Sequence, residues 1–415
     1  MNSRKRVVIT GMGAITPLGL ALDETWQGLL AGRSGVTTIT QFDASGAQSQ
    51  IAGEIKGFDP REYMDRKEAR RMARCSQVSI ATAQAALADA QLGLPLGDPG
   101  RVGVVMGTAV GGFELSVEVV DDHRRRGWGR VNPFSPIEML LNMPSHHVSC
   151  FAGAMGPIST EVAACASGTQ AIGEAADFIR LGAADVMICG GVEALIHFAP
   201  ISSFCAMRAL STRNDEPEKA SRPFAADRDG FVYSEGCAVL VLESLESATA
   251  RGAPIRGEIL GHASSSDAYH LAQPHPEGDG AVRAMSRALE DAGLVTDDVD
   301  YINAHGTGTP INDLVETKAV KRVFGDRAYE IPISSTKSMI GHAMGGAGAI
   351  EAAVCVRTIE ASIIHPTINL DVPDPECDLD YVSEGRRQAE VRVALSNSFG
   401  LGGQNACLVI GRYEA

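Results

Sequence analysis

The sequence lacks long apolar runs, since none of its 415 residues belongs to an uninterrupted apolar stretch of 18 or more. A membrane-spanning helix needs about 20 such residues, so none is predicted. Only a short apolar stretch precedes Gly11, and we therefore expect no secretory signal peptide. These features predict a cytoplasmic protein that does not bind a membrane.

Positive charge is also scarce, because 36 Lys and Arg residues stand against 51 Asp and Glu residues, for a net charge of −15. Nucleic-acid phosphates require a basic surface, so we expect no nucleic-acid partner. The nine cysteines lack CxxC pairs and zinc-ligand spacing. That pattern favours a reducing compartment and a protein that requires no metal.

Complete nucleotide-binding motifs are missing as well. Residues 7–13 (VVITGMG) look like a strand entering a dinucleotide-binding turn, but Thr16 stands where the third glycine belongs. No acidic residue follows about 20 positions later, as ribose binding requires. Walker, HExxH and GxSxG motifs are also absent from the sequence. We therefore expect no nicotinamide or other nucleotide cofactor.

The chain is long enough for two similar halves. Residues 86–92 (ALADAQL) lead to the strand-like run 102–106, and residues 288–294 (ALEDAGL) lead to the run 299–303. The apolar run 237–242 has a counterpart at 406–410. Apolar strands between helices predict an α/β protein with two mainly parallel or mixed sheets covered by helices. We place the boundary between the halves 1–252 and 253–415, where residues 251–254 (RGAP) break the pattern.

Three small-residue loops each present a reactive side chain: 163–168 (AACASG), 303–309 (NAHGTGT) and 337–342 (KSMIGH). Cys165 precedes a predicted helix over 170–180, so free amides and the helix dipole are expected to lower the pKa of its thiol. His305 and His342 follow strand-like runs and stand beside glycine. Alone, a cysteine of this kind is usually a small apolar residue, and such a histidine is usually structural. Together, one thiol and two imidazoles predict covalent acyl transfer.

With these strings, the chain resembles the β-ketoacyl-acyl-carrier-protein synthases of the thiolase superfamily. It is most similar to the elongating condensing enzymes of dissociated fatty-acid and polyketide synthesis, from residues 7–11 (VVITG) to 397–400 (NSFG) and onward. The resemblance implies a five-layered αβαβα thiolase fold with internal duplication. It also implies an acyl-carrier protein as partner, a homodimer, and no cofactor beyond the phosphopantetheine of the carrier.

The resemblance implies a role for each reactive residue. Cys165 would carry the acyl chain as a thioester, with an oxyanion hole made by its own amide and by the turn 400–403. His305 and His342 would donate hydrogen bonds to the malonyl thioester oxygen and stabilise the enolate left by decarboxylation. Lys337 would support the histidines electrostatically and keep them neutral.

Further residues are implied around the substrate. Thr307 and Thr309 match positions that bind the pantetheine arm, which we favour over the alternative that they stabilise a turn. Val110 matches the bottom of the acyl pocket, and Phe204 is also expected to contact substrate. Phe399 and Leu401 match the gate over the acyl-cysteine, where fatty-acid members usually carry a second Phe in place of Leu401.

Two charged sites have alternative interpretations. Family members hold a monovalent cation near the positions of Asn303, Glu351, Ser396 and Asn397, whereas Glu351 by itself is first a buried structural carboxylate. The basic residues at 66, 67, 70, 71 and 74 have helical spacing and would share a face, which is either a solvated surface or a dock for an acidic partner. The resemblance favours docking of the carrier protein by Lys67, Arg70 and Arg71, with Arg208 closer to the pantetheine entrance.

The sequence thus predicts a 3-oxoacyl-[acyl-carrier-protein] synthase of fatty-acid elongation. The alternative is the ketosynthase subunit of a dissociated polyketide or polyene synthase, paired with a chain-length-factor subunit, and Leu401 slightly favours it. A non-catalytic chain-length subunit is disfavoured because Cys165 is present. A biosynthetic thiolase is disfavoured because residues 397–399 (NSF) lack its second cysteine.

Overall fold

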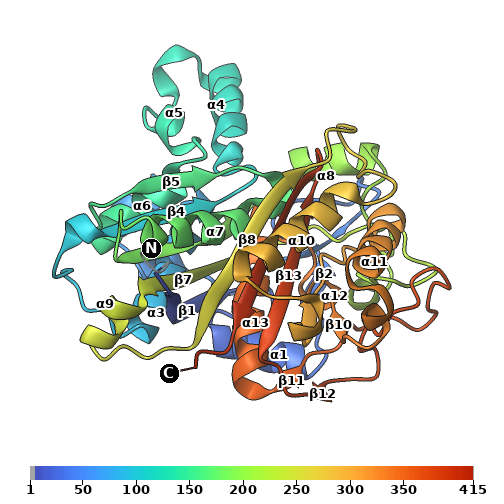
Figure 1. Cartoon of the computed structure of the whole chain (residues 1–415). Helices are drawn as coiled ribbons and strands as arrows, with labels where there is room; N and C mark the ends of the chain where they lie inside the picture. Colours follow the sequence, from blue (N-terminus) through green and yellow to red (C-terminus); the bar gives the residue numbers. More distant parts are fainter. Residues whose placement is uncertain (1–4, 415) are drawn as a thin grey trace.

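The computed structural model describes residues 5–414, in which ten strands form one sheet made of two similar halves (Figure 1). The strand order β5-β4-β6-β7-β1 of the first half returns in the second half as β10-β9-β13-β14-β8. The first half contains β1 (Val7–Ile15), β4 (Val102–Gly107), β5 (Ile158–Glu161), β6 (Val186–Glu193) and β7 (Gly236–Ser244). The second contains β8 (Gly257–Ser266), β9 (Tyr301–Asn303), β10 (Ile333–Ser334), β13 (Val393–Gly400) and β14 (Gln404–Gly411).

Strand directions repeat between the halves. β4 is parallel to β5 and β6, as β9 is parallel to β10 and β13. β7 and β14 each run antiparallel to both neighbours. The sequence predicted two separate sheets, but β1 and β8 pair through Val8–Glu258 and Ile9–Gly257. The two halves are therefore continuous, because their last strands approach closely enough at one end to share hydrogen bonds.

Helices complete five layers. The central helices α7 (Ser167–Arg180) and α13 (Ala347–Ala361) each contact strands of both halves. The outer helices α3 (Arg74–Asp89) and α6 (Met143–Ala152) cover the first half, and α10 (Asp279–Ala292), with α11 (Pro310–Phe324) beside it, covers the second. The predicted αβαβα arrangement is confirmed.

The burial of these elements explains their sequences. All nine residues of β7 are buried, so the strand is an almost continuous apolar run that lacks polar alternation. α13 is buried on nearly all sides, which is typical of a helix enclosed between two sheets. The central layer therefore forms the core that both halves share.

The N-terminal ends of the two central helices touch. A Cβ atom on Gly168 would lie 2.9 Å from the Gly345 carbonyl oxygen and from the Ala349 amide nitrogen. Only glycine leaves room for this backbone approach. The contact holds the turn before α7, which carries Cys165, against the corresponding turn before α13.

The remaining elements surround this core. α4 and α5 extend away from the sheet layers (Figure 1). Two small sheets pair β2 (Val36–Thr38) with β3 (Ile51–Gly53) and β11 (Ile363–Ile364) with β12 (Arg387–Gln388). The other helices are α1 (Leu22–Leu30), α2 (Arg66–Ala69), α4 (Phe113–Arg126), α5 (Ser135–Glu138), α8 (Phe198–Ala206), α9 (Leu245–Ala250) and α12 (Lys337–Ile340).

The predicted boundary at residues 252 and 253 falls in the segment between α9 and β8. It stays a prediction, because the shared sheet and central layer tie the two halves together. Across residues 5–414, no helix combines the length and apolar composition that crossing a membrane would require.

Candidate active site

Cys165 lies in a 3₁₀ turn (Ala164–Ala166) that runs directly into α7. Ala164 has a φ of +49°, a left-handed conformation that costs energy for a residue with a side chain. The Ser167 hydroxyl holds this turn, because it accepts a hydrogen bond from the Ala163 amide at 2.9 Å and donates one to the Ala164 carbonyl at 2.7 Å. The helix begins three residues earlier than predicted, so Cys165 sits immediately before its first turn.

The prediction of a lowered thiol pKa is wrong. Burial raises the pKa of the Cys165 thiol to about 11, and the negative Glu193 adds to the rise. Hydrogen bonds from the backbones of Leu401 and Cys165, together with the positive Lys337, oppose this effect without overcoming it. The helix dipole loses to burial because the thiol is only 3% exposed. At neutral pH the resting residue is therefore a thiol.

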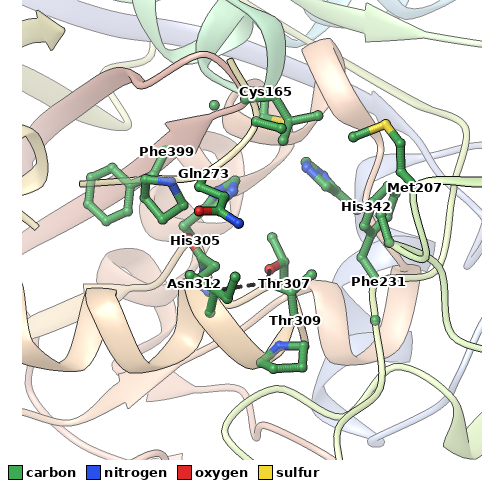
Figure 2. A pocket seen from close by; sticks show the side chains of 18 of the residues that line it. Cys165, Met207, Phe231, Gln273, His305, Thr307, Thr309, Asn312, His342 and Phe399 are labelled. Atoms are coloured by element: carbon green, nitrogen blue, oxygen red, sulfur yellow. Dashed lines mark hydrogen bonds between the residues drawn. The ribbon is translucent and has the colours of Figure 1, made fainter. Parts of the chain in front are cut away.

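The structure brings Cys165, His305 and His342 together from three loops. One ligand atom of each, the sulfur and a ring nitrogen of either histidine, lies within 4.8 Å of the other two. The imidazole rings are 5.3 Å apart between centroids and nearly perpendicular, at 86°. Figure 2 shows both rings facing the space below the sulfur. A group bound there contacts the thiol and both imidazoles at once.

Both histidines are neutral. Burial, followed by the charge of Lys337, lowers the pKa of His305 and of His342 well below the usual value. Lys337 is itself 1% exposed and forms a short ion pair with the buried Glu351. Burial raises the pKa of Glu351 to about 7, although Lys337 opposes the rise. Burial, with a smaller contribution from the Lys337 ammonium group, thus keeps the imidazoles uncharged, whereas the sequence analysis expected only the contribution of Lys337.

The loop around His305 is braced by two acidic residues on α11 that the sequence analysis missed. Glu316 accepts hydrogen bonds from the amides of His305 and Gly306, both at 2.8 Å. Asp313 accepts from the amides of Thr307 and Gly308 at 3.1 Å or slightly more. The detectable signal was two acidic residues three positions apart on a helix that follows a glycine-rich loop. If these bonds were lost, four buried backbone amides would have no hydrogen-bond partner.

A cavity of about 360 Å³ leads to the three residues (Figure 2). Five residues predicted around the substrate line it: Arg208, Thr307, Thr309, Phe399 and Leu401. Val110 and Phe204 are not among its described lining residues. The Val110 amide binds the Glu193 carboxylate at 3.3 Å, and Phe204 packs behind the lining residue Phe231, with 5.3 Å between ring centroids. Phe204 therefore shapes the cavity indirectly.

The two threonines differ in their roles. The Thr309 hydroxyl caps α11 by accepting a hydrogen bond from the Asn312 amide at 3.3 Å, so the turn-stabilising interpretation holds for this residue. The Thr307 hydroxyl lies 3.0 Å from the Thr309 hydroxyl and faces the cavity with it (Figure 2). Phe231, Met207, Gln273 and Asn312 also line the cavity, and the sequence analysis did not identify them.

Buried oxygen atoms of Asn303, Glu351 and Ser396 fit the cation that the family resemblance implies. In the part of the chain that the structure describes, Asn303 Oδ1 and Glu351 Oε2 are buried without hydrogen-bond partners. Ser396, the partner of Asn303 in the β9–β13 pairing, has a buried hydroxyl that likewise has no hydrogen-bond partner among the described residues. It lies beside Cys355, one helical turn after Glu351. Asn397 differs, since its carboxamide binds Glu316 at 3.3 Å and Cys407 at 3.4 Å. Its side chain is therefore engaged away from this oxygen cluster.

The basic segment 66–74 does not form one helical face, so that prediction is wrong. α2 ends at Ala69, Ala73 is extended (φ −61°, ψ 152°), and α3 begins at Arg74. Arg74 turns inward because its Nε lies 2.6 Å from the buried Glu235 carboxylate. Lys67, Arg70 and Arg71 remain exposed, and the Arg71 guanidinium lies 4.7 Å from the Phe134 ring centroid. Four of the five basic side chains, at 66, 67, 70 and 71, thus remain exposed on α2 and the turn that follows it.

A buried thiol beside neutral imidazoles, all three lining one cavity, is suited to holding an acyl group as a thioester. On a five-layered thiolase-like fold, this chemistry defines an acyltransferase that makes carbon–carbon bonds.

Comparisons with known proteins agree with this class. Residues 4–248 match the β-ketoacyl synthase N-terminal domain, and residues 256–371 match its C-terminal domain. A 3-oxoacyl-[acyl-carrier-protein] synthase 2 of Synechocystis sp. is 49% identical over 411 residues, 99% of each chain. The chain therefore belongs to the β-ketoacyl synthase family, and the resemblance stated from the sequence is confirmed.

Solved structures show the same fold. The ishigamide ketosynthase/chain length factor has a TM-score of 0.93 and 36% identity, over 99% of this chain and 100% of that chain. A type II polyketide ketosynthase bound to the hexaketide, in complex with its acyl-carrier protein, has a TM-score of 0.92 and 34% identity over the same shares.

Proposed function

We infer that this chain is a 3-oxoacyl-[acyl-carrier-protein] synthase that elongates acyl chains by decarboxylative condensation with a malonyl thioester. The observation that carries this inference is that ligand atoms of Cys165, His305 and His342 lie within 4.8 Å of one another in the lining of the cavity. Full-length similarity to a 3-oxoacyl-[acyl-carrier-protein] synthase 2 supports the same reaction. We assign the individual roles as follows.

The first half-reaction transfers the acyl chain to Cys165. The thiol sulfur attacks the thioester carbonyl of the carrier-bound substrate, and its proton passes through a neighbouring neutral imidazole to the departing pantetheine sulfur. A sulfur–carbon bond forms and another breaks, so a new thioester results. The backbone amides of Cys165 and Leu401, which both point at the sulfur, stabilise the oxyanion of the tetrahedral intermediate.

The second half-reaction uses both histidines as donors. The bond between the malonyl carboxylate and the adjacent carbon breaks, carbon dioxide leaves, and the electron pair forms an enolate whose oxygen accepts hydrogen bonds from His305 and His342. The enolate carbon attacks the acyl-Cys165 thioester, a carbon–carbon bond forms, and the sulfur departs with the electron pair of the broken carbon–sulfur bond. The thiolate then takes up one proton from solvent. Neutral imidazoles suit this step because each keeps one N–H for the developing charge.

The oxygen cluster of Asn303 Oδ1, Glu351 Oε2 and Ser396 Oγ would hold a monovalent cation. Such a cation would neutralise negative charge on the Glu351 carboxylate, which is paired with Lys337. It would also hold the residues around Lys337 in place. The reaction needs no other cofactor in this proposal, since the phosphopantetheine of the carrier protein brings both substrates. Thr307 and Thr309 would contact that arm.

An acyl-carrier protein would dock at Lys67, Arg70 and Arg71, with Arg208 at the entrance of the cavity. The type II polyketide ketosynthase described above is solved with its own carrier protein, which supports this class of partner. We place the enzyme in the cytoplasm. A second copy of the chain would pair along β5, which ends the order of the described strands.

The alternative is a polyketide ketosynthase that works with a chain-length factor. The structural similarity to the ishigamide ketosynthase/chain length factor and the aliphatic Leu401 at the gate favour it. Mass spectrometry of the acyl group that Cys165 captures from a mixture of acyl-carrier proteins discriminates the two: saturated chains support elongation of fatty acids, and unreduced polyketone or polyene chains support the alternative.

The experiment that tests the proposed reaction replaces the nucleophile. Cys165→Ala should abolish both acylation and condensation, whereas Cys150→Ala, at an exposed cysteine, should leave both rates unchanged. If chain extension continues in the Cys165→Ala variant, the proposed nucleophile is wrong.

A further inference from the structure

His365 is a fully buried histidine next to β11 that takes no part in the proposed reaction. Its Nδ1 lies 3.0 Å from the Pro366 carbonyl oxygen. A carbonyl oxygen can only accept, so Nδ1 carries the ring hydrogen. Burial lowers the pKa of His365 to about 4, which leaves the ring neutral at physiological pH. Its Nε2 is therefore a hydrogen-bond acceptor with a single lone pair.

Three hydroxyl groups surround this acceptor. Thr336 Oγ1 is 3.1 Å from Nε2, Ser334 Oγ is 3.3 Å away and Tyr301 Oη is 3.5 Å away. Tyr301 Oη and Ser334 Oγ also lie 2.7 Å from each other. One of the three hydroxyls donates its only hydrogen to His365.

The amide nitrogen of Asn303 contacts two of these hydroxyls, Thr336 Oγ1 at 3.0 Å and Tyr301 Oη at 3.1 Å. If Thr336 or Tyr301 donates to His365, that hydroxyl has no hydrogen left and must accept one from Asn303. If Ser334 donates to His365, Tyr301 must donate to Ser334, and Tyr301 again has to accept from Asn303. Every allocation of hydrogens therefore turns the amino end of the Asn303 carboxamide toward the hydroxyls.

We propose that His365 is a positioning residue that fixes the orientation of the Asn303 carboxamide and so directs Asn303 Oδ1 into the oxygen cluster with Glu351 and Ser396. Among the described residues Oδ1 has no hydrogen-bond partner, as this orientation requires. Without the His365 acceptor the hydroxyls are free to donate to Asn303. The carboxamide can then rotate and present its amino group to the cluster, where it repels a cation. The inference rests on the proposed cation site.

The test removes the acceptor and measures cation binding. His365→Leu removes Nε2, and His365→Phe does the same while keeping the ring volume. His365→Gln places a carboxamide oxygen where Nε2 stood. Thr336→Val is the matched control, since it deletes one hydroxyl but leaves the routes through Ser334 and Tyr301 intact.

The readout is the rise in unfolding midpoint when choline chloride is replaced by KCl, or by NaCl, at constant ionic strength. The salt concentration that produces half of the maximal rise should be similar for the wild type and for the His365→Gln and Thr336→Val variants. In His365→Leu and His365→Phe, half of the rise should require about 10–100-fold more of the cation, as is typical when a residue that orients a ligand is lost.

A natively folded His365→Leu or His365→Phe variant with the wild-type cation response would overturn the proposal. If neither variant shows a native near-ultraviolet spectrum, His365→Gln decides, and a folded Gln variant without the response would contradict it. A wild type that responds to neither cation removes the cation site and the inference with it. That result would leave the outcome for Cys165→Ala unchanged, so failure of the inference and failure of the proposed reaction are distinguishable.

Discussion

Cys165 is a nucleophile that rests as a thiol, and this has a direct consequence for its chemical reactivity. With a pKa of about 11, only about one part in 10,000 is thiolate at pH 7. Because the thiolate is the reactive form, the rate of alkylation by iodoacetamide should rise about tenfold for each pH unit between 7 and 10. Mass spectrometry of the peptide that contains Cys165 measures this rate.

The alkylation measurement needs a correction for the exposed Cys150, which the Cys165→Ala variant supplies. A rate that levels off below pH 9 would show that backbone hydrogen bonds and Lys337 outweigh burial.

His305 and His342 should affect decarboxylation more than acylation. Removal of one preorganised donor typically reduces a rate by about 100–1000-fold. We therefore expect His305→Ala and His342→Ala to suppress carbon dioxide release from a malonyl-carrier substrate by that factor. Acylation of Cys165, detected as an increase in protein mass, should still occur. A reduction of less than tenfold in carbon dioxide release would exclude the donor role of the residue replaced.

Lys337 contributes both to stability and to the charge state of the histidines. Lys337→Met leaves the Glu351 carboxylate buried without its cation, and breaking such a pair typically costs 3–5 kcal/mol, so we expect the free energy of unfolding to fall by about 3–5 kcal/mol. The double variant Lys337→Met with Glu351→Gln should recover most of the lost free energy of unfolding. Denaturant unfolding measures both, and equal stabilities for the single and double variants would argue against the buried pair.

The same lysine has an effect on pH dependence. Its charge lowers the pKa of His305 and His342, so its removal raises both values. Protonation then begins at higher pH, and the acidic limb of the decarboxylation profile of Lys337→Met should move to higher pH. An unmoved limb would mean that burial alone keeps the imidazoles neutral.

At the scale of elements, α2 and the turn after it carry the exposed basic residues. Reversal of Lys67, Arg70 and Arg71 together to Glu should raise KM for carrier-bound substrates, with a smaller effect on pantetheine mimics that lack the protein. The effect should shrink at high salt, because exposed charges are screened. The matched control reverses three other exposed cations, Arg287, Arg386 and Arg392. Equal KM values for both triple variants would reduce the proposed dock to a general charge effect.

This segment also shows why helical spacing was an incomplete guide. The positions 66, 67, 70, 71 and 74 fit one helical face, but the buried Glu235, which is distant in sequence, draws Arg74 inward. The pairing of β1 with β8 has the same cause. Contacts between residues far apart in the chain leave no periodic pattern in a sequence.

The duplicated elements were easier to predict from the sequence, because each repeat keeps its own local pattern of apolar and polar residues. The sequence paired the runs 102–106 and 299–303, which become the equivalent strands β4 and β9. The structure also has a 3₁₀ turn before α7 and another before α13. Ala164 and Met344 occupy the same position in these turns and both have positive φ, +49° and +40°. The shape of the catalytic turn is thus a property of the repeat. Only the residue that follows, Cys165 or Gly345, makes one copy reactive.

At the scale of the whole molecule, the ten-stranded sheet ends at a strand that is poorly covered. In β5, Ile158 is 54% exposed, and Val162 just beyond the strand is 47% exposed. An uncovered apolar edge strand is a template for pairing with another chain. The proposed homodimer would satisfy this edge in both copies, because a two-fold axis brings the same strand to itself.

Light scattering coupled to gel filtration tests this assembly. The wild type should have about twice the 43.6 kDa mass of the chain, and Ile158→Glu should shift it toward the monomer, since a charge would be buried at the apolar edge that each copy presents. Leu181→Glu is the matched control, because Leu181 is 82% exposed and lies outside β5. A monomeric wild type would contradict the proposed dimer, and an Ile158→Glu variant that stays dimeric would place the interface on a different surface. A purified wild type that elutes at the dimer mass, without an added second subunit, would also favour the homodimer over the chain-length-factor heterodimer.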